Sequence, residues 1–194
     1  MVKMTNLRHL MTEELIIREC RSGNKKYYEM LYRHFYSYAM GISLRYGNNR
    51  EDALEILNDS FLKVFDKIEQ FIPEQPFKAW LRRIIINTAI DHYRRNLKHM
   101  HRSELNEAEG IAVADGGIIS QLTANDILSL LEELPQMHRV VFNLTEIEGF
   151  SHEEVAEMLS IPSSSSRVYL TRAKKSLRSL IEKKFFNEYE RSIG

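Results

Sequence analysis

Apolar residues along most of this chain recur every three or four positions, the spacing at which side chains share one face of an α-helix. The first such stretch begins after Thr12, whose hydroxyl suits a helix cap, and ends at Gly23, a common helix stop. Longer stretches follow at 24–46, 50–70 and 76–95. No strand-length alternation of apolar and polar residues stands out, so the pattern predicts an all-α fold.

The helical pattern fails over residues 97–123. Several glycines stand there among scattered acidic residues, without a sustained apolar period. A stretch of this length is unusual for a connection inside one compact domain. We therefore expect two small helical domains, 1–96 and 124–194, joined by a flexible linker at 97–123.

The C-terminal domain is expected to contain a helix-turn-helix, because a capped short helix, a tight break and a basic helix follow one another. Ser151 and Glu154 stand at capping-box spacing, and Ser160–Pro162 forms the break. The pattern predicts helices at 125–134, 136–149 and 151–159, and a last one from residue 163 onward.

The last predicted helix has two unlike sides. The side suited to packing on the domain holds Ser166, Tyr169, Leu170, Ala173, Leu177 and Leu180. The opposite side holds Ser164, Arg167, Val168, Thr171, Lys174, Lys175 and Arg178. Hydroxyl and basic side chains near the start of a recognition helix suit base edges and phosphates in a major groove. A basic helix face is often only a solvated surface, but its place after a capped helix and a turn favours DNA binding.

The third predicted helix also has an apolar side, formed by Ala53, Ile56, Leu57, Ser60, Phe61 and Val64. Its other surface carries Glu55, Asn58, Asp59 and Lys63. Taken alone, this acidic and amide surface describes a solvated helix and no site.

The fourth predicted helix follows a short, proline-braced aromatic loop at 70–77. Arg83, Asn87 and Arg94 run along one side of this helix, and Trp80 stands near its start. Such a loop could hold an unstacked base, because base–aromatic stacking contributes roughly 1–3 kcal/mol per base. The alternative is that the aromatic residues pack the core; we favour it for Phe77 and leave it open for Trp80.

Composition narrows the classes of function. The chain has 194 residues, 43% hydrophobic and 28% charged, and its net charge is zero. Basic residues crowd 82–102 and 167–184, a distribution that suggests contact with a polyanion beside a differently charged partner. No apolar run approaches the roughly 20 residues that span a bilayer, and the N-terminus has no signal-peptide core, so we expect a cytoplasmic protein without membrane insertion.

An enzyme is the least favoured class. The chain has no P-loop, GxSxG or HExxH motif, and we expect no catalytic residue, metal or cofactor. His92, His99 and His101 are poor candidates for metal ligands, because arginines lie among them and no cysteine is near. The one cysteine, Cys20, excludes an internal disulfide and is expected to be a small buried side chain.

The combination of motifs resembles a known family. DALEILNDSFLKVF, then FKAWLRRIIINTAIDHYRR, then LEELPQMHRVVFNLTEIEGFSHEEVAEMLSIP and RVYLTRAKKSL are similar to regions 2 and 4 of bacterial sigma-70 factors. The likeness is to the small extracytoplasmic-function (ECF) type, which keeps only these two regions, and it covers about 24–184 apart from the linker. It implies a transcription initiation factor that binds core RNA polymerase, directs it to promoters and promotes DNA melting.

The resemblance also implies roles for individual positions. Region 2, expected within 1–96, would bind the beta-prime clamp helices of polymerase through Glu55, Asn58, Asp59 and Lys63. Its 70–77 loop would capture a base of the minus-ten element, and Trp80, Arg83, Asn87, Arg94 and Arg95 would lie along DNA. Region 4, expected within 124–194, would contact the beta subunit flap and bind the minus-thirty-five element through Ser164, Arg167, Val168, Thr171, Arg172 and Lys175.

Several positions depart from the family pattern. Ser160 stands where a glycine is usual in the turn, and positive φ there would cost a serine about 1 kcal/mol. Ser166 places a hydroxyl on the apolar side of the last helix, Tyr169 replaces a common arginine, and Asn58 replaces a more frequent glutamine. Val168 and Thr171 are therefore expected to contact thymine methyl groups.

The linker, acidic at Glu104, Glu107, Glu109 and Asp115, would resemble the segment that runs toward the RNA exit path, with a solvated tether as the alternative. An anti-sigma factor is a possible further partner of a protein of this type. Two other readings stay open at this point. A stand-alone helix-turn-helix regulator would leave 50–95 without a role, and a helical protein-binding adaptor would show no salt-dependent affinity for DNA.

Overall fold

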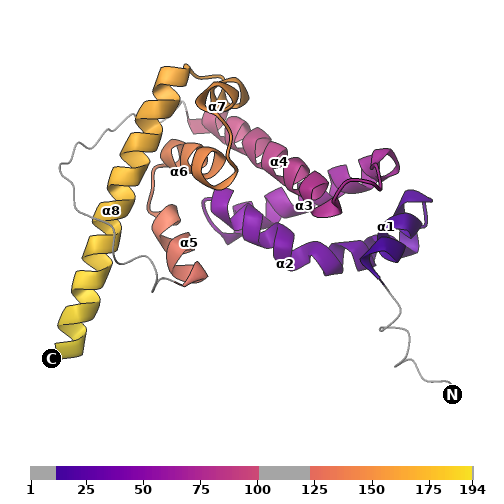
Figure 1. Cartoon of the computed structure of the whole chain (residues 1–194), viewed down its shortest axis with the longest axis horizontal. Coiled ribbons are helices and arrows are strands. Elements are labelled where there is room, and N and C mark those ends of the chain that lie inside the picture. The colour runs from indigo at the N-terminus through magenta and orange to yellow at the C-terminus, as the bar shows by residue number, and fades with distance from the viewer. Residues whose placement is uncertain (1–11, 101–122, 194) are drawn as a thin grey trace. The chain divides into compact units, whose positions relative to one another are not determined.

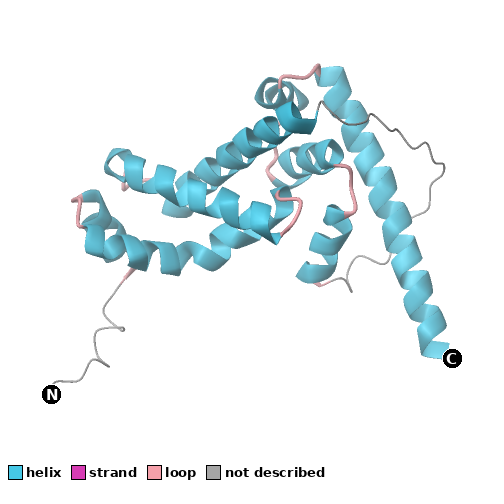
Figure 2. Cartoon of the chain, turned by 180° about the vertical axis from the view of Figure 1, so that it is seen from behind, coloured by secondary structure: helices cyan, strands magenta, loops and turns pink. Residues whose placement is uncertain are grey.

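The computed structural model describes residues 12–100 and 123–193, without the side chains of 97–100, 124–125 and 185–193. Every regular element within these ranges is a helix or a helical turn, joined by short loops (Figure 2). The predicted all-α fold is therefore confirmed for the described residues.

The chain packs into two units (helices labelled in Figure 1). The first comprises the chain up to Ser43 together with Arg50–Ala89, and the second comprises Leu44–Asn49 together with the chain from Ile90 on. Helices α2 (Tyr28–Tyr46) and α4 (Phe77–Met100) contribute to both units.

The first unit opens with α1 (Glu13–Arg21), which the predicted cap begins: the Thr12 hydroxyl accepts a hydrogen bond from the Leu15 N–H at 3.3 Å. Gly23 follows it with φ +79°, the left-handed conformation in which helices commonly end. A single 3₁₀ turn, η1 (Lys25–Tyr27), leads into α2.

The core of the first unit forms where the apolar pattern placed it. Helix α3 (Arg50–Lys67) continues as the turn η2 (Ile68–Gln70), and its buried residues are Ala53, Ile56, Leu57, Ser60, Phe61 and Val64, as predicted. Phe77 at the start of α4 is only 3% exposed, and its ring centroid lies 4.7 Å from that of Phe35 and 5.2 Å from that of Phe71. The expectation that Phe77 is a core residue is confirmed.

The second unit contains α5 (Ala124–Glu132), α6 (Gln136–Phe142), the π-helical turn η4 (Asn143–Ile147), α7 (His152–Leu159) and α8 (Ser163–Ile193). Leu131, Leu134 and Ala173 form one apolar cluster of this unit, against which Phe142, Leu177 and Leu180 pack. The side of the last helix that was predicted to face the domain therefore does so at these positions.

Polar side chains also lie inside the second unit. Arg139 is 2% exposed and donates to the Asn48 side-chain oxygen at 2.7 Å. Asn143 is fully buried, and its amide donates to the Arg45 carbonyl at 2.6 Å. Buried polar groups need such partners, because leaving one without a hydrogen bond costs roughly 1–3 kcal/mol.

Several element boundaries differ from the sequence expectation, among them the ends of the helices expected at 136–149 and 76–95. The helix expected at 136–149 widens into the π-helical turn after Phe142, where the Glu148 N–H donates to the carbonyl of Asn143. Helix α4 continues to Met100, past the expected start of the linker. The rest of the linker up to residue 122, with its acidic residues, lies outside the described residues, so the expected domain limits stay predictions.

Candidate nucleic-acid interface

The turn of the helix-turn-helix contains a strained residue. Ser160 has φ 55° and ψ 45°, and among the described residues it alone combines a side chain with positive φ. Its N–H donates to the Glu157 carbonyl, and the Ile161 N–H donates to the Ala156 carbonyl at 3.0 Å. These bonds close the end of α7 and set the direction in which α8 leaves the turn.

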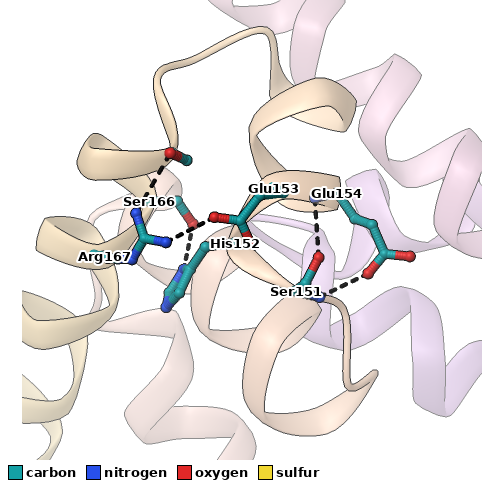
Figure 3. Close-up of polar contacts among 7 residues, drawn as sticks. Ser151, His152, Glu153, Glu154, Ser166 and Arg167 are labelled. Atoms are coloured by element: carbon teal, nitrogen blue, oxygen red, sulfur yellow. Dashed lines mark hydrogen bonds and ion pairs between the residues drawn. The ribbon is translucent and has the colours of Figure 1, made fainter.

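The start of α7 is fixed by the predicted capping box (Figure 3). The Ser151 hydroxyl accepts from the Glu154 N–H at 3.2 Å, and the Ser151 N–H donates to the Glu154 carboxylate at 2.8 Å. The hydrogen bonds from Ser151 lower the pKa of Glu154, the backbone one most, so this carboxylate stays charged over a wide pH range.

Two side chains of α7 reach the first turns of α8 (Figure 3). The His152 ring lies with Nδ1 2.9 Å from the hydroxyl oxygen of Ser166, which is fully buried. The Glu153 carboxylate accepts from the Arg167 guanidinium at 2.7 Å. The Ser166 hydroxyl, which is unexpected on the apolar side of the helix, thus has a partner in His152, and no sequence pattern identified that partner.

The outward side of α8 is exposed as the pattern predicted. Exposed residues on it are Ser164, Arg167, Val168, Thr171, Arg172 and Lys175. The Thr171 hydroxyl donates to the Arg167 carbonyl at 2.9 Å, so it is occupied within the helix. Val168 is 46% exposed, which leaves an apolar contact available at the middle of this surface.

Tyr169 turns toward the domain and is half-buried, as its place in the predicted packing set requires. Its ring centroid lies 5.5 Å from that of His138 in α6. Burial lowers the pKa of His138, and the nearby charge of Arg172 lowers it further, so this ring is neutral near pH 7.

Helix α4 brings the predicted residues of the N-terminal domain into three different settings. Trp80 is half-buried, with its ring centroid 5.2 Å from that of Phe71 and 5.5 Å from that of Phe77, so it belongs to the aromatic cluster while part of its surface stays exposed. Arg83, Asn87 and Arg95 are exposed. Arg94 is half-buried, and its guanidinium donates to the carbonyl of Met158 near the end of α7, within the second unit.

The predicted polymerase-binding residues lie together on α3. Glu55 and Asn58 are exposed, and Asp59 and Lys63 are half-buried. The Asn58 side chain is held by the Tyr32 hydroxyl, which donates to its oxygen at 3.1 Å.

Sequence reasoning missed two exposed apolar residues that adjoin the predicted sites. Leu62, 67% exposed, follows the buried Phe61 on α3, and Ile72, 53% exposed, stands in the aromatic loop after Phe71. Leu62 could have been noticed as an apolar residue outside the buried stripe of its helix. Ile72 could have been noticed as an apolar residue in a loop, between Phe71 and Pro73.

The described residues contain no group of three or more side chains that could hold a metal ion. His92 is 4% exposed, and its Nδ1 lies 3.3 Å from the side-chain nitrogen of Asn96, while His99 and His101 fall outside the described side chains. Cys20 is free and fully buried, as expected. Of the helices described, none combines the length and the apolar character needed to cross a membrane.

Comparison with known proteins matches two regions of the chain to known families. The family Sigma-70 region 2 matches residues 31–98, and the family Sigma-70, region 4 matches residues 124–177. These two stretches together make up more than half of the chain, and they occur in the order that the motifs predicted.

Full-length relatives are similar over most of the chain. The ECF RNA polymerase sigma-E factor of Haemophilus influenzae is 24% identical over 183 residues, 89% of this chain and 96% of the relative. The proteins of the same name from Salmonella typhimurium (strain LT2) and Escherichia coli (strain K12) are each 22% identical, over 89% of this chain and 95% of theirs.

Two solved structures are similar at a lower level. One is CnrH in complex with the cytosolic domain of CnrY, with a TM-score of 0.47, 22% identity, and coverage of 88% of this chain and 97% of that one. The other is the sigma factor RpoE in complex with the anti-sigma factor NepR from Bartonella quintana, with a TM-score of 0.45, 22% identity, and coverage of 87% and 92%. On the two matched regions and the full-length relatives, the chain belongs to the sigma-70 family of RNA polymerase sigma factors and, within it, to the ECF type.

Proposed function

We propose that this ECF sigma factor binds core RNA polymerase, directs it to promoters that carry minus-ten and minus-thirty-five elements, and promotes DNA melting there. The observation that carries the proposal is the pairing of a region 2 match and a region 4 match in one chain, each with an exposed polar surface where the family binds its partners. The alternative of a stand-alone helix-turn-helix regulator is not favoured, because it gives the matched region 2 no role.

Region 4 is proposed to dock α8 in the major groove of the minus-thirty-five element. Arg167, Arg172 and Lys175 supply positive charge on the exposed side. The exposed apolar Val168 suits a thymine methyl group, and the outward Ser164 suits a base or phosphate contact at the start of the helix.

Region 2 is proposed to hold an unpaired base of the minus-ten element beside the aromatic loop. Phe71 and Phe77 are buried and fix the loop, whereas Trp80 and Ile72 keep exposed surface on which a base can stack. Stacking of roughly 1–3 kcal/mol per base offsets the few kcal/mol that unpairing costs. Arg83, Asn87, Arg94 and Arg95 would then contact the adjoining backbone.

Core polymerase is proposed to bind α3 through its acidic and amide surface. Glu55, Asn58, Asp59 and Lys63 would meet the beta-prime clamp helices, and the exposed Leu62 would add an apolar anchor among them. Region 4 would contact the beta subunit flap. An anti-sigma factor that covers these surfaces would hold the protein inactive.

The proposed domain boundaries are those expected from the sequence: region 2 in 1–96, a linker in 97–123 and region 4 in 124–194. The protein would act in the cytoplasm as a binding factor without catalytic residues or cofactors of its own. It would contribute to initiation by binding promoter DNA, which selects the promoter and stabilises the separated strands.

Run-off transcription tests the proposal. Bacterial core RNA polymerase would be given fragments of the source genome with and without the full chain. Discrete new transcripts with a shared upstream sequence would support a promoter-specificity factor. No new transcripts, together with tight specific DNA binding by the protein alone, would refute it in favour of a stand-alone regulator.

A further inference from the structure

The ion pair between Glu153 and Arg167 joins the two helices of the helix-turn-helix at the surface that faces outward (Figure 3). Glu153 lies in the first turn of α7, and Arg167 lies one turn into α8. The guanidinium donates through Nη2 to the Glu153 carboxylate at 2.7 Å and through Nη1 to the Ser163 hydroxyl at 3.4 Å. Two acceptors from different helices therefore fix the orientation of this side chain.

Stability does not account for this arrangement. The side chains of Arg167 and Glu153 are 54% and 66% exposed, and exposed ion pairs contribute little to folding because water and salt screen them. An arginine side chain loses much rotamer freedom when it binds, so holding it in place beforehand reduces the cost of a contact made later. The pair is thus better explained by what Arg167 binds than by the fold.

We infer that Glu153 is a positioning residue for DNA recognition, which holds the Arg167 guanidinium in the orientation that reads a base edge. The inference rests on the proposed docking of α8 in the major groove. Nη2 gives one hydrogen to the Glu153 carboxylate, and Nη1 gives one to the Ser163 hydroxyl. The remaining N–H donors of the guanidinium stay available for the edge of a guanine, which is the base that arginine binds in bidentate geometry.

The carboxylate has a second effect, through its charge. The N–H of its own residue and then Arg167 lower the pKa of Glu153, so it is ionised at neutral pH. A negative charge beside the guanidinium weakens the attraction of Arg167 for phosphate, which is the source of sequence-independent affinity. Glu153 therefore lowers total affinity for DNA while raising the share of it that depends on sequence.

The test compares Glu153→Gln with the wild type in full-length protein bound to core polymerase. Binding would be measured on a promoter found by run-off transcription and on the same fragment with its minus-thirty-five element scrambled. We expect the ratio of the two affinities to fall roughly three- to tenfold, because a bidentate arginine contact carries much of the discrimination at one base pair. Affinity for the scrambled fragment should rise, with a steeper dependence on salt.

Glu157→Gln is the matched control. Glu157 is an exposed residue of the same helix one turn further on, and its substitution removes the same charge. It should leave the affinity ratio unchanged. An equal fall in the ratio for Glu157→Gln would overturn the inference, because the effect would then come from charge alone.

A double-mutant cycle with Arg167→Ala separates the remaining possibilities. If Glu153 acts through Arg167, Glu153→Gln should cause no further loss of discrimination in the Arg167→Ala background. A full loss in that background would overturn the inference, since Glu153 would then contact a base directly, as carboxylates do with cytosine. An unchanged ratio for Glu153→Gln, with a large loss for Arg167→Ala, would overturn it while leaving the proposed function intact. No effect of Arg167→Ala on discrimination would also overturn the inference, because Arg167 would then read no base, while the proposed function would still rest on the run-off result.

Discussion

Replacing Ser160 by glycine should stabilise the helix-turn-helix, although it removes a side chain from a folded protein. Ser160 ends α7 with φ 55°, in the left-handed region. An L-residue pays roughly 1–2 kcal/mol there, because its Cβ crowds the following carbonyl oxygen. Glycine has no Cβ and adopts this conformation without that cost.

The gain is reduced by the unfolded state. Glycine gives the unfolded chain more conformational freedom than serine does, which destabilises the fold by about 0.4–1 kcal/mol. The net expectation is an increase of about 0.5–1 kcal/mol in the free energy of unfolding. With a urea m-value of about 2 kcal/mol/M, the midpoint of unfolding should rise by roughly 0.3–0.5 M.

Far-UV circular dichroism in urea would measure this midpoint. The chain's one tryptophan, Trp80, lies in the first unit, so its fluorescence would not report on the turn. Hydrogen exchange at the Ile161 amide, which donates to the Ala156 carbonyl at 3.0 Å, would report on the turn itself and should slow.

Ser160→Ala is the control, because alanine keeps the Cβ and with it the strain. We expect no gain from alanine. If glycine and alanine stabilise the protein equally, or if glycine lowers the midpoint, the strain at Ser160 does not limit stability and the reasoning is wrong.

Three further predictions concern other surfaces. Asp59→Arg should reduce binding to core polymerase at least tenfold in co-purification, whereas Glu69→Arg, the same charge change at an exposed position of the first unit outside the predicted surface, should not; wild-type binding by Asp59→Arg would place the interface elsewhere. Arg94→Ala combined with Arg95→Ala should slow promoter opening, followed by permanganate footprinting, and spare polymerase binding; an equal loss of both activities would contradict a DNA role. The pKa of Glu154 is lowered in the fold, so its contribution to stability is complete above the unfolded pKa of about 4.3 and is lost as pH falls through the lower folded value. Urea midpoints between pH 6 and 3 should therefore fall less steeply in Glu154→Gln, and parallel curves would refute this.

The sequence by itself determined the positions of most helices, the buried stripe of α3 and the caps at Thr12 and Ser151. The stripe from Ala53 to Val64 and the box of Ser151 with Glu154 involve residues at most a few turns apart on one helix, so local spacing specifies them. Positive φ at Ser160 was indicated only by the resemblance, because the family usually has a glycine at this position, and the structure shows it. The motifs of regions 2 and 4 likewise sufficed to indicate the family.

Only the tertiary structure decided which side chains meet across elements. The partners His152 with Ser166, Glu153 with Arg167 and Arg94 with the Met158 carbonyl come from segments separated in the chain. Periodicity states which face of a helix is buried, but it carries no information on what lies opposite that face or how far a polar side chain reaches. The exposure of Leu62 could not be predicted for the same reason. Whether an apolar residue outside the buried stripe is covered depends on the helices next to it and not on the sequence of its own helix.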